Sequence, residues 1–287
     1  FYPAPGHAEQ NPSDWYEAVK SNISALLQMS GISASDILAV CLDAATHTAV
    51  LMDKDFHVLR PAIYWTDSRS IHECAYLKEK HQELILRTAL HTADTIWTLP
   101  QLMWVWSHEP AVWEKTEKIL FAKDYIRYLL TGEYFTDYIE AQGSMLFDYK
   151  TMAWSAELCG ILGFDPGKLP LVIKPADIAG RVTKKAAEET GLREGTKVIC
   201  GTTDTAMEIF ASGAVKKGQM TVKLATAGRI CVVADRAYPD RNLVNYSHVT
   251  EGLWYPGTAT KSCASSYRWY RDTFGGEYGD LDREAEK

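Results

Sequence analysis

The chain has 287 residues, of which 46% are hydrophobic and 23% charged, a composition typical of a folded globular protein that excludes general disorder. Its 30 Lys and Arg against 37 Asp and Glu give a net charge of −7 with no basic run, which argues against nucleic acid as a partner. No apolar stretch reaches the roughly 18 residues needed to cross a bilayer, so no membrane partner is expected.

The six cysteines are widely spaced and form no C-x-x-C pair. Two of them, Cys200 in VICGTTD and Cys231 in RICVV, lie in apolar runs where a reduced thiol packs as a small hydrophobic group. This pattern argues against a disulfide framework or a zinc site and indicates a reducing, cytoplasmic location. The N-terminus, FYPAPGHAEQ, lacks the features of a signal peptide and reads like a chain entered partway through.

The first predicted element is a helix that begins after Asn11. Asn is a favoured N-cap residue, Pro12 suits the first helical position, and Gly31 is suited to end the helix. The 3.6-residue period predicts one apolar face, formed by Trp15, Val19, Ile23, Leu26 and Leu27.

Residues 36–45 are predicted to form a buried strand, with 49–53 as its continuation or its partner. A helical pattern follows from about residue 68 to 130 and ends at Gly132. A further helix is expected to close at 186–191.

The pattern next predicts a short strand at 197–200, a turn at 201–204 and a helix at 205–212. Residues 218–235 read as a β-hairpin whose turn is Ala-Thr-Ala-Gly. Alternating strands and helices favour an α/β sheet covered by helices. The composition changes near 216–218, which is a candidate domain boundary.

Asp204 follows the apolar strand in VICGTTDTAMEIF, where the next helix begins. Ligands bind at the carboxyl ends of strands in open α/β sheets, and a carboxylate there can accept a proton from a substrate hydroxyl. The same Asp could instead cap the helix, since Asp is a preferred N-cap residue. On this segment alone, both interpretations stay open.

The segment LATAGRI places Thr226, Ala227 and Gly228 between two strands. Small residues at such a tip let backbone N–H groups approach a phosphate, although they equally form a plain turn. GFDPGK at 163–168 is not a P-loop, because its glycines are one residue too close and Leu169 replaces the required Ser or Thr.

In AIYWTDSRS, Trp65, Asp67 and Arg69 come soon after a strand. An aromatic face with polar neighbours suits a sugar ring or polyol, and an Asp–Arg pair bracing a turn is the alternative. His47, in DAATH, is either a structural residue or a site residue. The motifs H-E-x-x-H and G-x-S-x-G do not occur in the sequence.

Seven segments together carry a family resemblance that covers nearly the whole chain. In order, they are EQNPSDWY (9–16), DAATHTAVLMD (43–53), RPAIYWTDSRS (60–70), LPQLMWVWSHEP (99–110), AKDYIRYLLTGEYFTD (122–137), GTTDTA (201–206) and LATAG (224–228). The ordered set resembles the FGGY-type carbohydrate kinases, most closely the xylulose kinases and related pentulose kinases.

The resemblance implies an actin/hexokinase-like (ribonuclease H-like) α/β fold, with a mixed sheet flanked by helices. Residues 1–217 would form the sugar-binding N-terminal domain and 218–287 the beginning of the nucleotide-binding domain, with ATP and sugar meeting in the cleft between them. The family's first phosphate loop and its magnesium-associated aspartate would precede Phe1. Its adenosine-binding part would follow Lys287, so the sequence resembles a piece of a kinase.

The resemblance also implies roles for individual residues. Asp204 would take the proton from the acceptor hydroxyl. The other expected site residues are Thr46, His47, Trp65, Asp67 and Thr205 for the sugar, and Ala225, Thr226, Ala227 and Gly228 for phosphate. Which residues of this sequence would contact the metal is left unassigned.

The implied reaction is phosphorylation of a terminal hydroxyl of a small sugar, most simply a ketopentose such as xylulose, by ATP with Mg²⁺. Three departures bear on which sugar it is: Gln101 replaces a usual Lys, Thr46 a Met of xylulose kinases, and Ala225 a more common Gly. The alternatives are a sugar-binding fragment without catalysis, or a related kinase for glycerol, gluconate or another polyol. A homodimer is a further expectation from the family.

Overall fold

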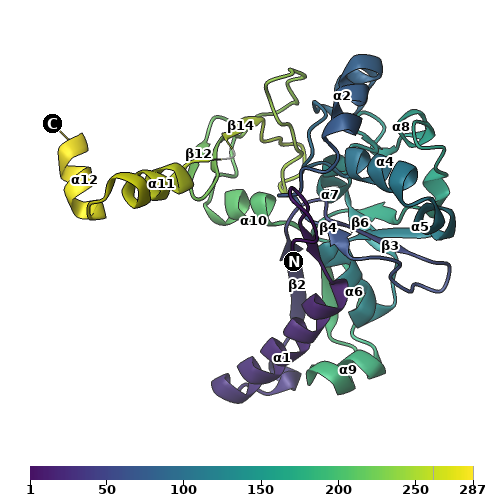
Figure 1. Cartoon of the computed structure of the whole chain (residues 1–287). Helices are drawn as coiled ribbons and strands as arrows, with labels where there is room; N and C mark the ends of the chain where they lie inside the picture. The colour runs from purple at the N-terminus through teal and green to yellow at the C-terminus, as the bar shows by residue number, and fades with distance from the viewer. Residues whose placement is uncertain (261, 287) are drawn as a thin grey trace.

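The computed structural model describes residues 1–260 and 262–286, and these form an α/β fold (Figure 1). The helices are α1 (Pro12–Ser30), α2 (Ile71–Lys80), α3 (Gln82–Ala89), α4 (Thr98–His108), α5 (Pro110–Lys115), α6 (Ala122–Thr131), α7 (Tyr138–Gly143), α8 (Ala156–Gly160), α9 (Lys184–Thr190), α10 (Asp204–Ala211), α11 (Ala264–Phe274) and α12 (Tyr278–Ala285). The strands are β1 (Glu9–Gln10), β2 (Ala39–Ala44), β3 (Ala49–Met52), β4 (Ala62–Ile63), β5 (Lys118–Phe121), β6 (Phe135–Asp137), β7 (Phe147–Asp148), β8 (Ala153–Trp154), β9 (Leu171–Ile173), β10 (Ile178–Arg181), β11 (Lys197–Thr203), β12 (Met220–Leu224), β13 (Gly228–Val232) and β14 (Gly257–Thr260).

Helix α1 confirms the first predicted element, with two differences. Gly31 ends it at φ +66° and donates its N–H to the Leu27 carbonyl, 3.2 Å away. Asn11 occupies the N-cap position with extended backbone, as expected, and Pro12 follows as the first helical residue, but the Asn11 side chain makes no capping hydrogen bond. Leu26 is 64% exposed and does not belong to the packed face, which faces α6 and α9.

Strand β2 pairs in parallel with β11, and β11 pairs antiparallel with β10. The expectation that β3 continues or partners β2 is wrong, because β3 pairs antiparallel with β5. Strand β5 lies inside the stretch whose period predicted only helix. Its four residues, KILF, are too few for the period to be read, and long-range pairing decides their conformation.

The predicted turn at 201–204 is strand up to Thr203, and α10 begins at Asp204. The register between β11 and β2 shifts between Ile199 and Thr202, and Gly201 lies in this irregularity with φ +71°. A bulge of this kind keeps the strand paired while it changes direction. As a result β11 reaches the helix that carries Asp204 without an intervening loop.

The predicted hairpin is confirmed as β12 and β13, to which β14 adds a third antiparallel strand. Figure 1 shows α11 and α12 extending from this sheet, away from the rest of the molecule. The boundary at 217/218 stays a prediction.

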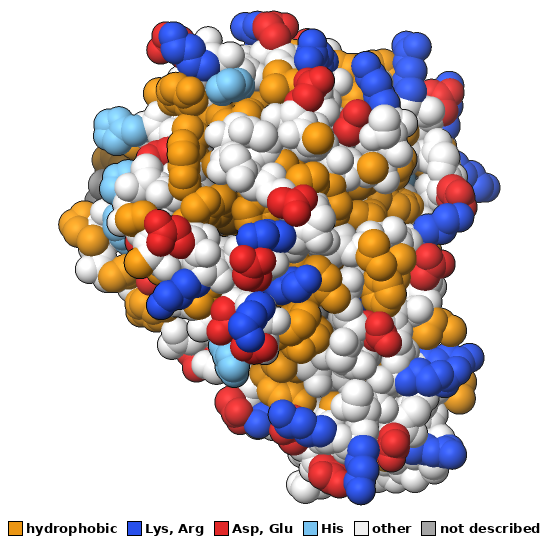
Figure 2. Space-filling view, turned by 90° about the vertical axis from the view of Figure 1, so that its right-hand side faces the viewer, with side chains coloured by type: hydrophobic (Ala, Val, Ile, Leu, Met, Phe, Trp, Pro, Cys, Tyr) orange, Lys and Arg blue, Asp and Glu red, His pale blue; other side chains and the backbone are white. Residues whose placement is uncertain are grey.

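The described residues bury two hydrophobic clusters, one around α4 and one among α1, α6 and α9. All six cysteines are free. None of the helices within residues 1–260 and 262–286 is both long and apolar enough to span a bilayer. On the face shown in Figure 2, basic and acidic side chains are interspersed instead of separated by sign.

Candidate active site

The parallel pairing of β2 and β11 brings two predicted site segments together. Ala44 and Thr203, the last residues of the two strands, are opposite each other. Because parallel strands end at the same edge of a sheet, the loops that follow them meet there. The Thr46 hydroxyl donates a hydrogen bond of 3.3 Å to Oδ1 of Asp204, which joins the two segments.

Asp204 is the first residue of α10, and Thr203 is the N-cap. The Thr203 hydroxyl accepts a hydrogen bond from the Ala206 N–H at 3.3 Å, so the interpretation of Asp204 as the cap is wrong. Oδ1 of Asp204 accepts the Thr205 N–H at 2.7 Å. Among residues 1–260 and 262–286, the hydrogen bonds to the Asp204 side chain come from the Thr46 hydroxyl and from the N–H and hydroxyl of Thr205, and all of them use Oδ1.

A second carboxylate lies at the same strand ends. Asp43 is in β2, opposite Thr202 of β11. Burial raises the pKa of Asp43, and the negative charge of Asp204 raises it further. The strand ends therefore hold two neighbouring carboxylates, Asp43 and Asp204.

Asp204 lines a pocket of about 230 Å³. Of the residues predicted for the site, the pocket contains Asp204, Thr46, His47, Trp65, Thr205, Ala227 and Gly228. The other lining residues are Ala45, Ile96, Trp97, Lys223, Arg229, Tyr246 and Ala259. The pocket thus combines a carboxylate, three aromatic side chains, hydroxyl groups and small residues. This composition suits a small polyhydroxylated ligand.

His47 is 6% exposed and has a left-handed backbone, with φ +52°. Its carbonyl accepts the Thr98 hydroxyl at 2.7 Å and its N–H donates to a Glu140 carboxylate oxygen, so this conformation is held from both sides. Burial lowers the pKa of His47 to about 3, and the charges of His91 and Arg229 act in the same direction. His47 is therefore a neutral imidazole, in which one ring nitrogen donates a hydrogen bond and the other accepts one.

Glu140 connects His47 to a buried ionic network. Lys123 lies 2.5 Å from Asp124 and 2.8 Å from Asp137, and all three side chains are fully buried. Burial by itself would lower the pKa of Lys123, but the two carboxylates outweigh it and the pKa is raised. Burial raises the pKa of Glu140 well above its usual value, while the nearby charge of Lys123 acts in the opposite direction. One oxygen of the Glu140 carboxyl group accepts the His47 N–H.

Gly143, the last residue of α7, lets this helix approach the site closely. A Cβ at Gly143 would lie 2.9 Å from the His47 ring, 3.0 Å from the Thr46 methyl and 3.1 Å from the Tyr246 hydroxyl. Glycine is therefore required for the packing behind the three pocket residues.

Asp67 does not line the pocket, which differs from its predicted contact with sugar. Its carboxylate accepts the Ala8 N–H at 2.5 Å and two groups of Arg69 at 2.9–3.0 Å, and it is 2% exposed. Arg69 also lies 2.8 Å from Glu9 and packs over the Trp104 ring. Because these partners occupy the Asp67 carboxylate, the Asp67–Arg69 pair braces the loop that carries Trp65.

Ala225 and Thr226 also lie outside the pocket lining. Their carbonyls accept the N–H groups of Ala264 and Cys263, each at 2.8 Å, at the start of α11. These contacts hold one side of the turn against α11 and leave Ala227 and Gly228 to line the pocket.

Comparison with known proteins now decides the family. The model of the N-terminal domain of the FGGY family of carbohydrate kinases matches residues 1–211. The chain belongs to the FGGY family of carbohydrate kinases. The FGGY chain is 31% identical to the xylulose kinase of Bacillus subtilis (strain 168) over 271 residues, which are 94% of this chain and 54% of that protein. It thus spans about half the length of the curated relatives it matches.

Solved structures agree with this membership. The FGGY chain is similar to a xyloylose kinase from Brucella ovis, with a TM-score of 0.92 and 30% identity over 99% of this chain and 59% of that one. The xylulose kinase from Rhodospirillum rubrum matches with a TM-score of 0.92 and 28% identity, again over 99% and 59%. The expected actin/hexokinase-like architecture is confirmed.

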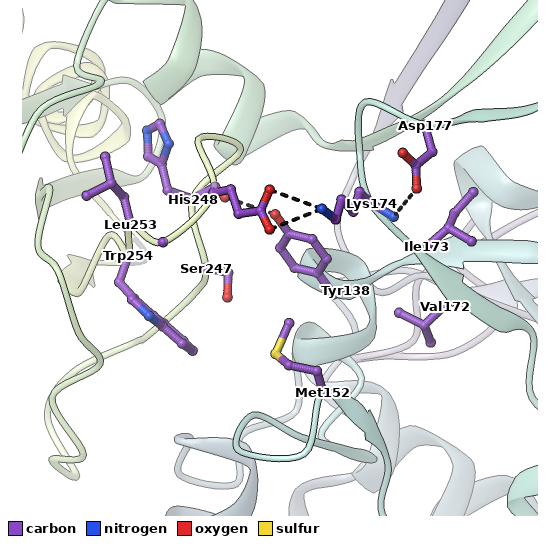
Figure 3. Close-up of a pocket in the computed structure, with 12 residues that line it drawn as sticks. Tyr138, Met152, Val172, Ile173, Lys174, Asp177, Ser247, His248, Leu253 and Trp254 are labelled. Atoms are coloured by element: carbon purple, nitrogen blue, oxygen red, sulfur yellow. Dashed lines mark hydrogen bonds and ion pairs between the residues drawn. The ribbon is translucent and has the colours of Figure 1, made fainter.

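A larger cavity of about 590 Å³ lies elsewhere in the FGGY chain (Figure 3). Lys174, labelled in Figure 3, and Glu251 both line this cavity and form an ion pair with nitrogen–oxygen distances of 3.0 Å. Asp177 accepts the Lys174 N–H at 3.0 Å, and the Tyr138 hydroxyl donates to the His248 carbonyl at 3.3 Å. The Ser247 hydroxyl and the His248 ring are bound to Gln142 and to the Ala214 carbonyl, outside this lining, and none of the predicted site residues lines the cavity.

Sequence reasoning missed several lining residues of the FGGY site. Trp97 comes from the start of α4 and Tyr246 from the segment before β14, and no local pattern connects either of them to Asp204. Gln142 fixes the latter segment, since its amide exchanges hydrogen bonds of 2.8 and 2.9 Å with Ser247. The sequence does offer a reason to expect Arg229 in the site, because Arg229 directly follows the predicted phosphate turn.

His91, which packs behind the pocket that contains Asp204, is predicted to make the folded FGGY chain less stable at acid pH. His91 is 1% exposed and stacks on Trp97 at 4.2 Å, and burial lowers its pKa to about 3. Below pH about 6.5 the unfolded chain binds a proton at His91 that the folded chain does not bind. The free energy of unfolding therefore decreases as the pH is lowered. At pH 5, relative to pH 7.5, we expect His91→Phe to remove about 2 kcal/mol of this loss in urea unfolding. The exposed His72→Asn serves as the control, and equal pH profiles for wild type and His91→Phe would contradict the prediction.

Proposed function

We propose that the protein transfers the γ-phosphoryl group of MgATP to a hydroxyl of a small polyhydroxylated sugar, a ketopentose such as xylulose. Membership of the FGGY family supports a carbohydrate kinase, and the relatives named xylulose kinases support this sugar class. The observation that carries the proposal is Asp204, which stands at the ends of two parallel strands inside a pocket of sugar size.

In this proposal Asp204 orients the acceptor hydroxyl and takes its proton as the oxygen attacks the γ-phosphorus. The bond from phosphorus to the β,γ-bridging oxygen breaks, and ADP leaves with its electron pair. General-base action of this kind contributes typically ~10²–10⁴ in rate.

The other pocket residues would hold the reactants. Thr46, His47 and Thr205 would hydrogen-bond sugar hydroxyls, while Trp65 would cover the C–H face of the sugar. Ala227 and Gly228 would approach the phosphate, with Ala225 and Thr226 fixing their turn. Asp67 would act as a positioning residue for Trp65.

No magnesium ligand is assigned. Within residues 1–260 and 262–286, the acids and histidines with metal-ligand spacing are Asp53, Asp55 and His57, and none of them lines the pocket. In this proposal Mg²⁺ enters the site with ATP, as the MgATP substrate.

A coupled assay for ADP on the full-length protein tests the proposal. D-xylulose, D-ribulose, D-xylose, glycerol and D-gluconate would be compared, and the phosphorylated product identified by mass spectrometry. We expect the largest kcat/KM with a ketopentose. If none of these acceptors stimulates ADP release in folded protein that binds MgATP, the proposed function is wrong.

A further inference from the structure

Arg229 lies on the side of the β12–β13–β14 sheet that faces the site. Its cross-strand partners are Lys223 of β12 and Ala259 of β14, and all three line the same pocket as Asp204. Side chains alternate between faces along a strand, and the next residue, Ile230, is 46% exposed on the opposite face. The guanidinium is thus directed toward the Asp204 side of the sheet.

Arg229 is also a cation without a counter-ion in the part of the chain that the structure describes. Its guanidinium has neither a hydrogen bond nor an ion pair with residues 1–260 or 262–286, although it is partly buried. Its cross-strand neighbour Lys223 differs, because Glu208 holds it at 2.6 Å. A partly buried charge without a partner is costly, and a bound anion would remove that cost.

We propose that Arg229 binds an oxyanion of the ligand beside Asp204, an inference that rests on the proposed kinase function. A planar guanidinium matches the paired oxygens of a phosphoryl group or of a carboxylate. The position favours the phosphoryl group in transfer, because Arg229 directly follows Gly228 of the phosphate turn and shares the pocket with Thr205. There it would neutralise charge while the acceptor oxygen bonds to phosphorus and the proton passes to Asp204. The alternative oxyanion for Arg229 is a carboxylate group on the sugar.

The test compares Arg229→Gln and Arg229→Lys with wild type in the full-length protein. Arg236→Gln is the matched control, since Arg236 is exposed, packs over Tyr238 and lies outside the pocket. The readouts are kcat and KM with D-xylulose and with D-gluconate, and calorimetric titration with inorganic phosphate. For a phosphoryl contact we expect Arg229→Gln to lower kcat with both acceptors by about 10- to 150-fold, and to weaken phosphate binding. KM for D-xylulose would change little, and Arg229→Lys would restore part of the loss.

A different pattern would identify the carboxylate as the oxyanion. In that case Arg229→Gln raises KM for D-gluconate by about 10-fold or more and leaves kinetics with neutral D-xylulose unchanged. The proposal is overturned if Arg229→Gln matches Arg236→Gln in all kinetic constants and in phosphate affinity. Because phosphate titration requires no turnover, it tests Arg229 even if no acceptor is phosphorylated and the proposed function fails.

Discussion

Asp204→Asn is expected to lower kcat by about 10²- to 10⁴-fold while KM for the sugar stays within a few-fold. The amide keeps an oxygen that can accept the Thr205 N–H, now bound at 2.7 Å, and keeps the shape of the side chain. It cannot take a proton from the acceptor hydroxyl, so the loss falls on the chemical step. Steady-state kinetics on the full-length protein measure both constants.

Asp14→Asn is the matched control, because Asp14 is an exposed carboxylate in the first turn of α1. It tests whether loss of one negative charge at a helix start is enough to reduce turnover. If kcat of folded Asp204→Asn stays within about threefold of the control, Asp204 is not the general base.

Gly201→Ala is expected to destabilise the fold by roughly 2–6 kcal/mol, a large share of the usual 5–15 kcal/mol. A Cβ at this position would lie 1.9 Å from the Leu42 carbonyl oxygen, and φ is +71°. The Gly201 N–H also donates to the Pro175 carbonyl at 3.0 Å, which limits how far the backbone can move. The affected strand leads directly to Asp204, so loss of activity should accompany loss of stability.

Gly213→Ala separates the cost of the Cβ clash from the cost of the left-handed backbone. Gly213 has a similar φ of +81°, but a Cβ there would have no neighbour within 4 Å. This control should cost only the left-handed backbone penalty of about 1–2 kcal/mol. Urea unfolding of both variants gives the difference, and equal costs would show that the backbone at Gly201 relaxes around the clash.

Individual residues of the site differed in how far the sequence could predict them. Thr46, His47, Trp65 and Asp204 follow apolar strand-like runs, so local patterns predicted that they lie near strand ends. The same patterns allowed Asp67 to contact the ligand, because nothing local shows that Arg69 and the Ala8 N–H occupy its carboxylate.

By itself, the sequence determined the class of the fold and most single elements. Helix α1 and the β12–β13 hairpin follow from interactions within a few residues, such as a fixed proline φ, a left-handed glycine and alternating side chains. The ordered motifs also pointed to the family that the comparisons show.

Only the tertiary structure decided which segments form the site. The parallel register of β2 and β11 places Thr46 against Asp204, although 158 positions separate them in the chain. Glu140 holds the left-handed His47, and Gly143 packs behind it. Such partners are selected by strand pairing and buried polar contacts between distant segments, which leave no periodic signal in either segment.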